Sequence, residues 1–213
     1  MLSKAFLPFF VAFTIAVVLV PLFIRLYNLF NIVDKRSHRK HHIHDVPTMG
    51  GLPLLIAFVS AVLIISGIPL DLDISVILGG LILMSILGLY DDLTEIKPSI
   101  KLIGQLGLAT FVYAFASIKL MSTYGVGGEI LLSPWVALPI TVLFMAFAAN
   151  AFNLIDGLDG LASTIGLVIF VFFGVWFLVY GQPILYIRAF AISGTLVAFL
   201  FFNWDPAKIF LGD

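Results

Sequence analysis

The chain has 213 residues, of which 62% are hydrophobic and 11% charged, and its formal net charge is −1 at pH 7. Soluble domains contain about 45–50% apolar and about 25% charged residues, so this composition argues against a water-soluble enzyme. The near-zero charge excludes a globally basic protein that binds nucleic acid, and the absence of cysteine excludes disulfides, thiolate catalysis and cysteine-bound metals. The composition indicates a polytopic membrane protein.

Seven stretches of the chain lack Asp, Glu, Lys and Arg, and their lengths are close to those of membrane-spanning helices. They are residues 5–24, 49–70, 74–90, 102–118, 130–155, 160–187 and 189–204. The turn-forming triplet Gly181-Gln182-Pro183 predicts the boundary between the sixth and seventh helices. Such long runs favour helices over the alternating strands of a barrel. We therefore predict an all-α, polytopic transmembrane bundle of about seven helices, organised as a single membrane domain over residues 1–213.

The loops that follow the first, third, fifth and seventh helices carry eight of the eleven basic residues. The positive-inside rule makes these loops cytoplasmic and places the N-terminus outside. The same loops carry all four histidines and nine of the twelve acidic residues. We therefore expect the chemistry at the cytoplasmic face of the inner (plasma) membrane.

Asp91 and Asp92 lie at the cytoplasmic end of the third apolar stretch. Two carboxylates at a helix C-terminus repel each other and face the negative end of the helix dipole, so a cation should offset them. Mg²⁺, held by few carboxylates and by substrate phosphates, would fit, and Mn²⁺ is the substitute. Lys101 either snorkels to the interface or reaches a phosphate beside the pair. The alternative is an acidic, solvated loop.

Four polar residues, Asn150, Asn153, Asp156 and Asp159, recur at every third position. On a helix or 3₁₀ turn this spacing brings their side chains near one face, and such a polar ridge at the end of an apolar span is costly without a function. The adjacent Gly157 permits a tight turn and close approach of a ligand to the backbone. A helix cap with a turn would explain one Asn and one Asp, but not all four residues.

The loop over residues 34–51 contains four basic residues and all four histidines. It would attract the anionic phosphates of lipids or nucleotides, although the positive-inside pattern alone also explains its Lys and Arg. The histidine spacing lacks the pattern of a zinc site. The end of the loop, Pro47-Thr48-Met49-Gly50-Gly51, is typical of a structured entry into the second helix.

Four segments, in this order, resemble the polyprenyl-phosphate N-acetylhexosamine-1-phosphate transferases of glycosyltransferase family 4. They are Pro-Thr-Met-Gly-Gly at 47–51, Asp91-Asp92 with Lys101, Asn-Ala-Phe-Asn-Leu-Ile-Asp-Gly-Leu-Asp-Gly-Leu at 150–161, and Pro-Ala-Lys-Ile-Phe-Leu-Gly-Asp at 206–213. The resemblance implies that undecaprenyl phosphate attacks the β-phosphorus of a UDP-N-acetylhexosamine and that UMP leaves. The form of the last segment favours UDP-GlcNAc, whereas the first segment is shared with phospho-MurNAc-pentapeptide transferase.

The resemblance also implies roles for individual residues. Asn153 and Asp213 are the expected Mg²⁺ ligands. The expected catalytic residues are Asp91, Asp92, Lys101 and Asp156, with Lys101 steadying the diphosphate. The expected substrate-binding residues are Thr48, Asn150, Gly157 and Asp159, with Asp159 contacting uracil. Because the acceptor phosphate is already an anion near neutral pH, direct attack is favoured over an aspartyl-phosphate intermediate.

The resemblance sets further expectations about the whole protein. The expected partners of the protein are undecaprenyl phosphate, a UDP-N-acetylhexosamine and membrane lipid, and no nucleic acid is expected. The oligomeric state compatible with the family is a homodimer. The reaction would be the first membrane step in making an envelope polysaccharide such as lipopolysaccharide or teichoic acid. Members of the family continue beyond this length, so we expect a C-terminally truncated fragment of a protein with about 10–11 helices.

Two other classes of membrane protein are weighed against this interpretation. A CDP-alcohol phosphotransferase also uses Mg²⁺ and Asp, but the segment that begins at Asp159 lacks the Arg and the later acids of its motif. A divalent-cation transporter would place acidic residues near mid-membrane and would move metal into vesicles. The transferase instead predicts Mg²⁺-dependent release of UMP.

Overall fold

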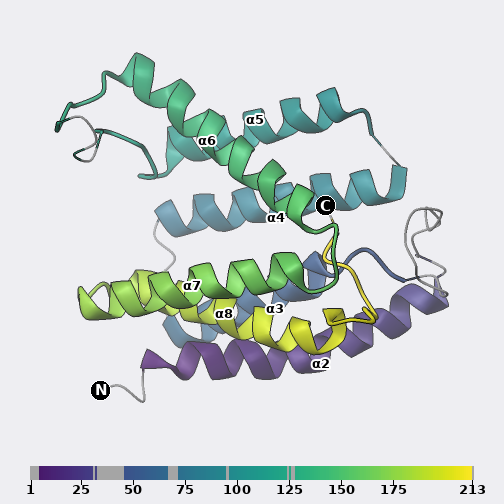
Figure 1. Ribbon diagram of the computed structural model, residues 1–213. Coiled ribbons are helices and arrows are strands. Elements are labelled where there is room, and N and C mark those ends of the chain that lie inside the picture. Colours follow the sequence, from purple (N-terminus) through teal and green to yellow (C-terminus); the bar gives the residue numbers. More distant parts are fainter. Residues whose placement is uncertain are drawn as a thin grey trace. The chain divides into compact units, whose positions relative to one another are not determined.

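The computed structural model describes residues 5–30, 32, 46–66, 72–94, 96–123, 125 and 128–212. Within these ranges the chain forms seven helices and an isolated β-bridge, which confirms the predicted all-α fold (Figure 1). The helices are α2 (Leu7–Leu29), α3 (Gly51–Ser66), α4 (Leu72–Thr94), α5 (Pro98–Phe115), α6 (Pro134–Ile155), α7 (Leu161–Val179) and α8 (Pro183–Asn203). Most of the basic loop, including the four histidines, lies outside the described residues.

Proline and glycine set several of the helix boundaries. Pro98 and Pro183 stand in the first turns of α5 and α8, where a missing N–H is tolerated and the fixed φ suits a helix. Gly181 has a φ of 66° between α7 and α8. This left-handed conformation favours glycine and confirms that the Gly181-Gln182-Pro183 triplet separates two helices.

The chain divides into two compact units. The first comprises Met1–Ile68 and Ile155–Asp213 and contains α2, α3, α7 and α8; the second comprises Pro69–Leu154 and contains α4, α5 and most of α6. In the first unit α8 packs against α2, α3 and α7, and in the second α4 packs against α5. That both units act as one membrane domain stays a prediction.

Small residues allow the helices of the first unit to approach closely. Ala16 of α2, Ala57 of α3 and Ala198 of α8 form one fully buried cluster. Gly194 of α8 lies against the backbone of α2, because a Cβ built there would be 2.2 Å from the carbonyl oxygen of Phe9. Small residues at helix contacts are typical of membrane bundles, in which dispersion contacts replace the hydrophobic drive of water.

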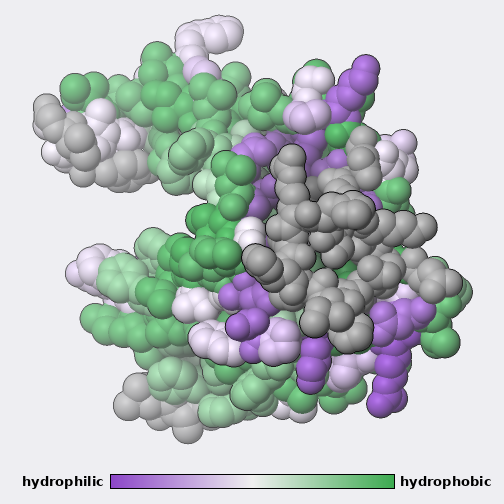
Figure 2. Space-filling view, turned by 45° about the vertical axis from the view of Figure 1, so that its right-hand side comes forward, coloured by the Kyte–Doolittle hydropathy of each residue, from purple (hydrophilic) through white to green (hydrophobic). Residues whose placement is uncertain are grey.

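Large apolar side chains remain exposed along the helices. Trp135 and Phe147 of α6 are 87% and 72% exposed. The visible face of the molecule is largely hydrophobic along the helices, as Figure 2 shows. Among the described helices α2, α4, α6, α7 and α8 are long and apolar enough to cross a membrane. The 16-residue α3 is shorter, and the 18-residue α5 carries Lys101 and Gln105.

Replacing Gly194 by Ala should destabilise the first unit. The added Cβ would collide with main-chain atoms of Phe9, which can move only if α2 moves, and overpacking of this kind costs about 1–3 kcal/mol. Gly79→Ala is the matched control, because a Cβ at this α4 position meets nothing within 4 Å. Thermal unfolding in detergent should give a lower Tm for Gly194→Ala only. Equal Tm values for the two variants would contradict the close α2–α8 contact.

Candidate active site

The acidic pair lies in the last turn of α4, as predicted, and Asp91 is held by two contacts. Its Oδ2 accepts a hydrogen bond from Lys101 Nζ at 3.0 Å, and its Oδ1 accepts one from the Ile96 N–H at 3.0 Å. The side chains of Asp91 and Lys101 are only 12% and 14% exposed. The sequence predicted that a cation lies beside the acidic pair. For Asp91, this cation is the ammonium of Lys101.

The Asp91–Lys101 ion pair fixes the connection between two helices. Asp91 belongs to α4, Lys101 to the first turn of α5, and Ile96 to the segment between them. Charged hydrogen bonds that are shielded from water are stronger than exposed ones. An ammonium carries three donors, so its bond to Asp91 does not preclude a contact with a phosphate. The half-buried Asp92 follows directly on α4.

The predicted polar ridge is only partly helical. Asn150 and Asn153 lie on α6, which ends at Ile155, whereas Asp156 and Asp159 lie in the turn over 156–160. Asn150 Nδ2 donates to Gln105 Oε1 at 2.6 Å and to the Ala146 carbonyl at 2.8 Å. Asn150 thus links α6 to α5 inside the second unit. Its predicted role in binding substrate is not tested by this contact.

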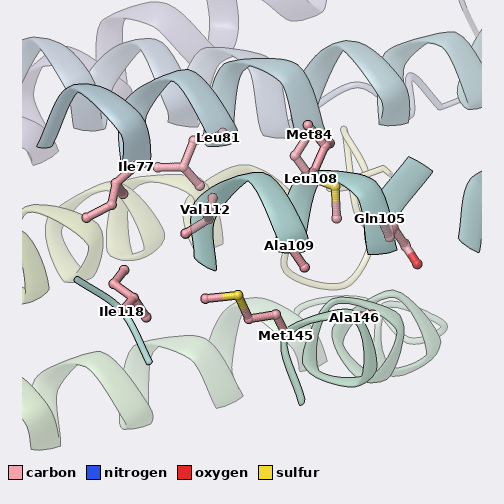
Figure 3. A pocket seen from close by; sticks show the side chains of 11 residues that line it. Ile77, Leu81, Met84, Gln105, Leu108, Ala109, Val112, Ile118, Met145 and Ala146 are labelled. Carbon is pink, nitrogen blue, oxygen red and sulfur yellow. The ribbon is translucent and has the colours of Figure 1, made fainter. Parts of the chain in front are cut away.

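An apolar cavity of about 250 Å³ lies within the second unit, beside Gln105 (Figure 3). Residues of α4, α5 and α6 line it, together with Ile118 from the segment after α5. Gln105 is one helical turn from Lys101 on α5, and Ala109 and Val112 continue the lining along the same helix. Along α5, the charged Lys101 therefore comes first, and the residues that line the apolar cavity begin one turn later.

In the first unit, the turn after α6 is joined to the segment at 206–212. Asp159 Oδ2 accepts a hydrogen bond from the Ala207 N–H at 2.9 Å. Asn203 Oδ1 accepts hydrogen bonds from the Gly160 N–H and the Ser163 hydroxyl, and its Nδ2 donates to the Ile209 carbonyl. Two of the four motif segments thus meet within this unit.

The segment at 47–51 joins the same arrangement through main-chain hydrogen bonds. The Phe210 N–H donates to the Pro47 carbonyl at 2.8 Å, the Gly50 N–H to the Phe210 carbonyl at 2.9 Å and the Gly51 N–H to the Leu211 carbonyl at 2.7 Å. A Cβ at Gly50 would lie 2.5 Å from the Phe210 oxygen. Glycine is therefore required here, and this contact confirms a structured entry into α3. Thr48 lies half-buried in this segment.

The predicted site residues fall into both units. Asp91, Asp92, Lys101, Asn150 and Asn153 belong to the second, and Thr48, Asp156, Gly157, Asp159 and Asp213 to the first. Within the second unit, the structure pairs Asp91 with Lys101. Within the first, it links the turn that carries Asp159 to Ala207. Asp213 lies outside the described residues, so its expected role as a metal ligand stays a prediction.

The donor chemistry suits Mg²⁺ only in part. In the described ranges no three His, Asp or Glu side chains form a group that could hold a metal ion. The carboxylate of Asp92 and the amide oxygen of Asn153 are nevertheless hard oxygen donors of the kind that Mg²⁺ prefers. Mg²⁺ commonly keeps water and substrate phosphates as its other ligands. These residues therefore fit an ion that arrives with a diphosphate better than an all-protein cage.

Two buried amide side chains, Gln105 and Asn203, were not among the predicted site residues. Gln105 is 4% exposed and Asn203 1% exposed, and each bonds a residue of the 150–163 region. A polar side chain inside or at the end of an apolar run was the signal that could have identified them, because such a group must find a partner. Their partners in the 150–163 region, however, lie 40 or more residues away in the chain.

Comparison with known proteins gives one family and a set of relatives. The glycosyl transferase family 4 model matches residues 74–213. The chain is 32% identical over 211 residues to a probable undecaprenyl-phosphate N-acetylglucosaminyl 1-phosphate transferase of Bacillus subtilis. It is 29% identical over 228 residues to a phospho-N-acetylmuramoyl-pentapeptide-transferase of Clostridium beijerinckii, and 32% identical over 224 residues to one of Streptococcus pneumoniae.

These alignments cover nearly all of this chain but not all of the relatives. They include 96%, 99% and 95% of the chain, but only 57%, 69% and 66% of the three relatives, respectively. The apolar helices and the membrane enzymes among the relatives together identify a multi-pass membrane protein.

Replacing Lys101 by Met should destabilise the second unit. Asp91 would keep its bond to the Ile96 N–H but lose its cation, and leaving a nearly buried charge without a partner costs about 1–3 kcal/mol. Lys97→Met, at the exposed position four residues earlier, is the control. Unfolding of Lys101→Met, Asp91→Asn and the double variant should yield a coupling energy between the two sites. Strictly additive effects would contradict the ion pair.

Proposed function

Because the chain belongs to glycosyl transferase family 4, we propose that the protein transfers N-acetylhexosamine 1-phosphate from a UDP-sugar to a polyprenyl phosphate. The arrangement at the end of α4 carries the proposal, since it sets the half-buried Asp92 next to the Asp91–Lys101 ion pair. A fixed ammonium can bind and orient a diphosphate directly, and carboxylates can do so through a bound Mg²⁺. The match over residues 74–213 and the relatives' names support the same reaction.

The proposed reaction balances without a covalent enzyme intermediate. An oxygen of the polyprenyl phosphate bonds to the β-phosphorus of the UDP-sugar, and the bond from this phosphorus to the oxygen of UMP breaks. The products are a polyprenyl diphosphate sugar and UMP. Since the acceptor is already an anion near neutral pH, the protein has mainly to position two anions and to offset their repulsion.

The chain's own residues have distinct roles in this proposal. Lys101, oriented by Asp91, donates to a diphosphate oxygen, and its charge lowers the repulsion between the two substrates. Asn153 and Asp213 would hold Mg²⁺, and the carboxylate of Asp92 could supply a further oxygen donor. The ion, when bound, would neutralise diphosphate charge. In the turn after α6, Gly157 and Asp159 are assigned to the nucleotide and Asp156 to the catalytic residues.

A membrane location explains why these groups lie at helix ends. A polyprenyl acceptor keeps its chain in the bilayer while its phosphate reaches the interface. The apolar cavity that follows Lys101 along α5 suits the chain, and Lys101 itself suits the phosphate. The basic residues follow the positive-inside pattern, so we assign this end of α4 to the cytoplasmic face of the plasma membrane, where UDP-sugars are made. A homodimer stays a prediction.

The full-length protein should release UMP when it is given undecaprenyl phosphate, UDP-GlcNAc and Mg²⁺, and EDTA should stop the release. Asp92→Asn and Asp156→Asn should each lower kcat roughly a hundredfold, because each removes a charge proposed to hold the reacting groups. Glu129→Gln is the matched control, since this exposed residue lies between α5 and α6. Wild-type kcat in both Asp variants would refute the site, and turnover undiminished by EDTA would refute the metal.

The two kinds of relative, named for N-acetylglucosaminyl 1-phosphate transfer and for phospho-N-acetylmuramoyl-pentapeptide transfer, differ in the sugar nucleotide that donates the phosphosugar. We propose UDP-GlcNAc as the donor, since the Bacillus subtilis relative named for GlcNAc is 32% identical over 96% of this chain. The Clostridium and Streptococcus relatives support UDP-MurNAc-pentapeptide as the second candidate. A competition assay should give UDP-GlcNAc at least about a tenfold higher kcat/KM, and the opposite preference would assign the second function.

A further inference from the structure

Asn203 is the last residue of α8, and its side chain is almost completely buried. It is 1% exposed, yet all of its polar atoms have partners. Oδ1 accepts from the Gly160 N–H and from the Ser163 hydroxyl, each at 3.1 Å, and Nδ2 donates to the Ile209 carbonyl at 2.9 Å. A buried amide in an apolar chain is stable only with such partners.

These partners determine which way the amide faces. Gly160 offers an N–H and Ile209 a carbonyl, so the oxygen must face the first and the nitrogen the second. A carboxylate could keep the bonds to Gly160 and Ser163 but would turn an acceptor toward the Ile209 oxygen. Apolar residues would leave the Gly160 N–H and the Ile209 oxygen unpaired. The environment therefore selects an amide side chain over a carboxylate or an apolar one.

The bond to Gly160 also completes the start of α7. Gly160 is the N-cap of α7, has a φ of 73° and has no side chain to bond the free N–H groups of the first turn. Asn203 supplies an oxygen to the Gly160 N–H and anchors the hydroxyl of Ser163 in that turn. Asn203 thus fixes the end of the 156–160 turn to the end of α8.

A second contact fixes the same two segments at another point. Asp159 Oδ2 accepts from the Ala207 N–H at 2.9 Å, while Asn203 bonds Ile209 two residues further on. Two contacts between the same pair of segments limit both their separation and their relative rotation. The carboxylate of Asp159 is thereby oriented by the segment that Asn203 holds.

We propose that Asn203 is a positioning residue, whose amide holds the 156–160 turn and the 206–212 segment in the arrangement required for transfer. This inference rests on the proposed function, because both segments carry or adjoin residues assigned to that reaction. Asn203 is not a catalytic residue, since burial and its three bonds withhold its polar atoms from a substrate.

Two variants and one matched control test the proposal in the full-length protein. Asn203→Asp keeps the size of the side chain but replaces the donor to Ile209 by an acceptor, and Ser163→Ala removes one of the three bonds. Ser193→Ala is the control: Ser193 is equally buried but donates to the Ala189 carbonyl within α8. We expect kcat to fall about tenfold or more for Asn203→Asp and about two- to fivefold for Ser163→Ala, with Ser193→Ala unchanged.

Hydrogen–deuterium exchange supplies a readout that is independent of turnover. Exchange in Asn203→Asp should accelerate about tenfold in peptides covering 157–163 and 206–211, but not in the middle of α8. Ser163→Ala should show a smaller change in the first peptide only. Restoring a donor with Asn203→Gln should recover part of the protection and part of the turnover, because the amide can again face both partners.

The outcomes separate the two proposals. Wild-type exchange in both peptides of Asn203→Asp, or faster exchange with unchanged kcat, would overturn the positioning role. If Asn203→Asp loses protection throughout α8, Ser163→Ala decides: faster exchange at 157–163 with lower kcat supports the role, and any other result overturns it. If the wild type releases no UMP from any UDP-sugar, the proposed function fails, and the exchange pattern alone decides whether Asn203 holds the two segments.

Discussion

Every buried polar group in this apolar chain needs a hydrogen-bond partner, and this constraint explains the contacts that organise each unit. Unpaired polar groups cost several kcal/mol in an apolar medium. Asp91 therefore bonds Lys101 and the Ile96 N–H, Asn150 bonds Gln105, and Asn203 bonds three groups. Among the described residues no buried side-chain N or O atom lacks a partner. The helices are positioned by apolar packing and the segments at their ends by these bonds.

The same contacts hold residues that we propose for the chemistry. In the second unit the ion pair between Asp91 and Lys101 ties the end of α4 to the start of α5, which keeps a charge of each sign near Asp92. In the first unit the segment at 203–211 is bonded both to the segment at 47–51 and to the segment at 156–163, which are distant from each other in the chain. Structural stability and the orientation of the proposed site residues thus depend on one set of hydrogen bonds, and a substitution in that set should change both.

Much of the fold could be predicted from the sequence, because long charge-free runs and the Gly181-Gln182-Pro183 triplet act locally. The seven helices and the break between α7 and α8 follow from them. The polar ridge was predicted less well: α6 ends at Ile155, so Asn150 and Asn153 are helical and Asp156 and Asp159 are not. The roles of Gln105 and Asn203 could not be predicted, because each depends on a partner brought near only by tertiary packing.

The contacts between 47–51 and 210–211 have a consequence for how such enzymes diversify. All three bonds join main-chain atoms, so they require glycine at 50 but do not require particular side chains at Thr48 or Leu211. Contacts between main-chain atoms persist through most substitutions of the side chains on the same segments. The main-chain contacts between 47–51 and 210–211 form such a frame. We therefore expect homologous enzymes with different sugar donors to retain this frame and to have acquired their selectivity by exchanging side chains upon it, without rebuilding the scaffold.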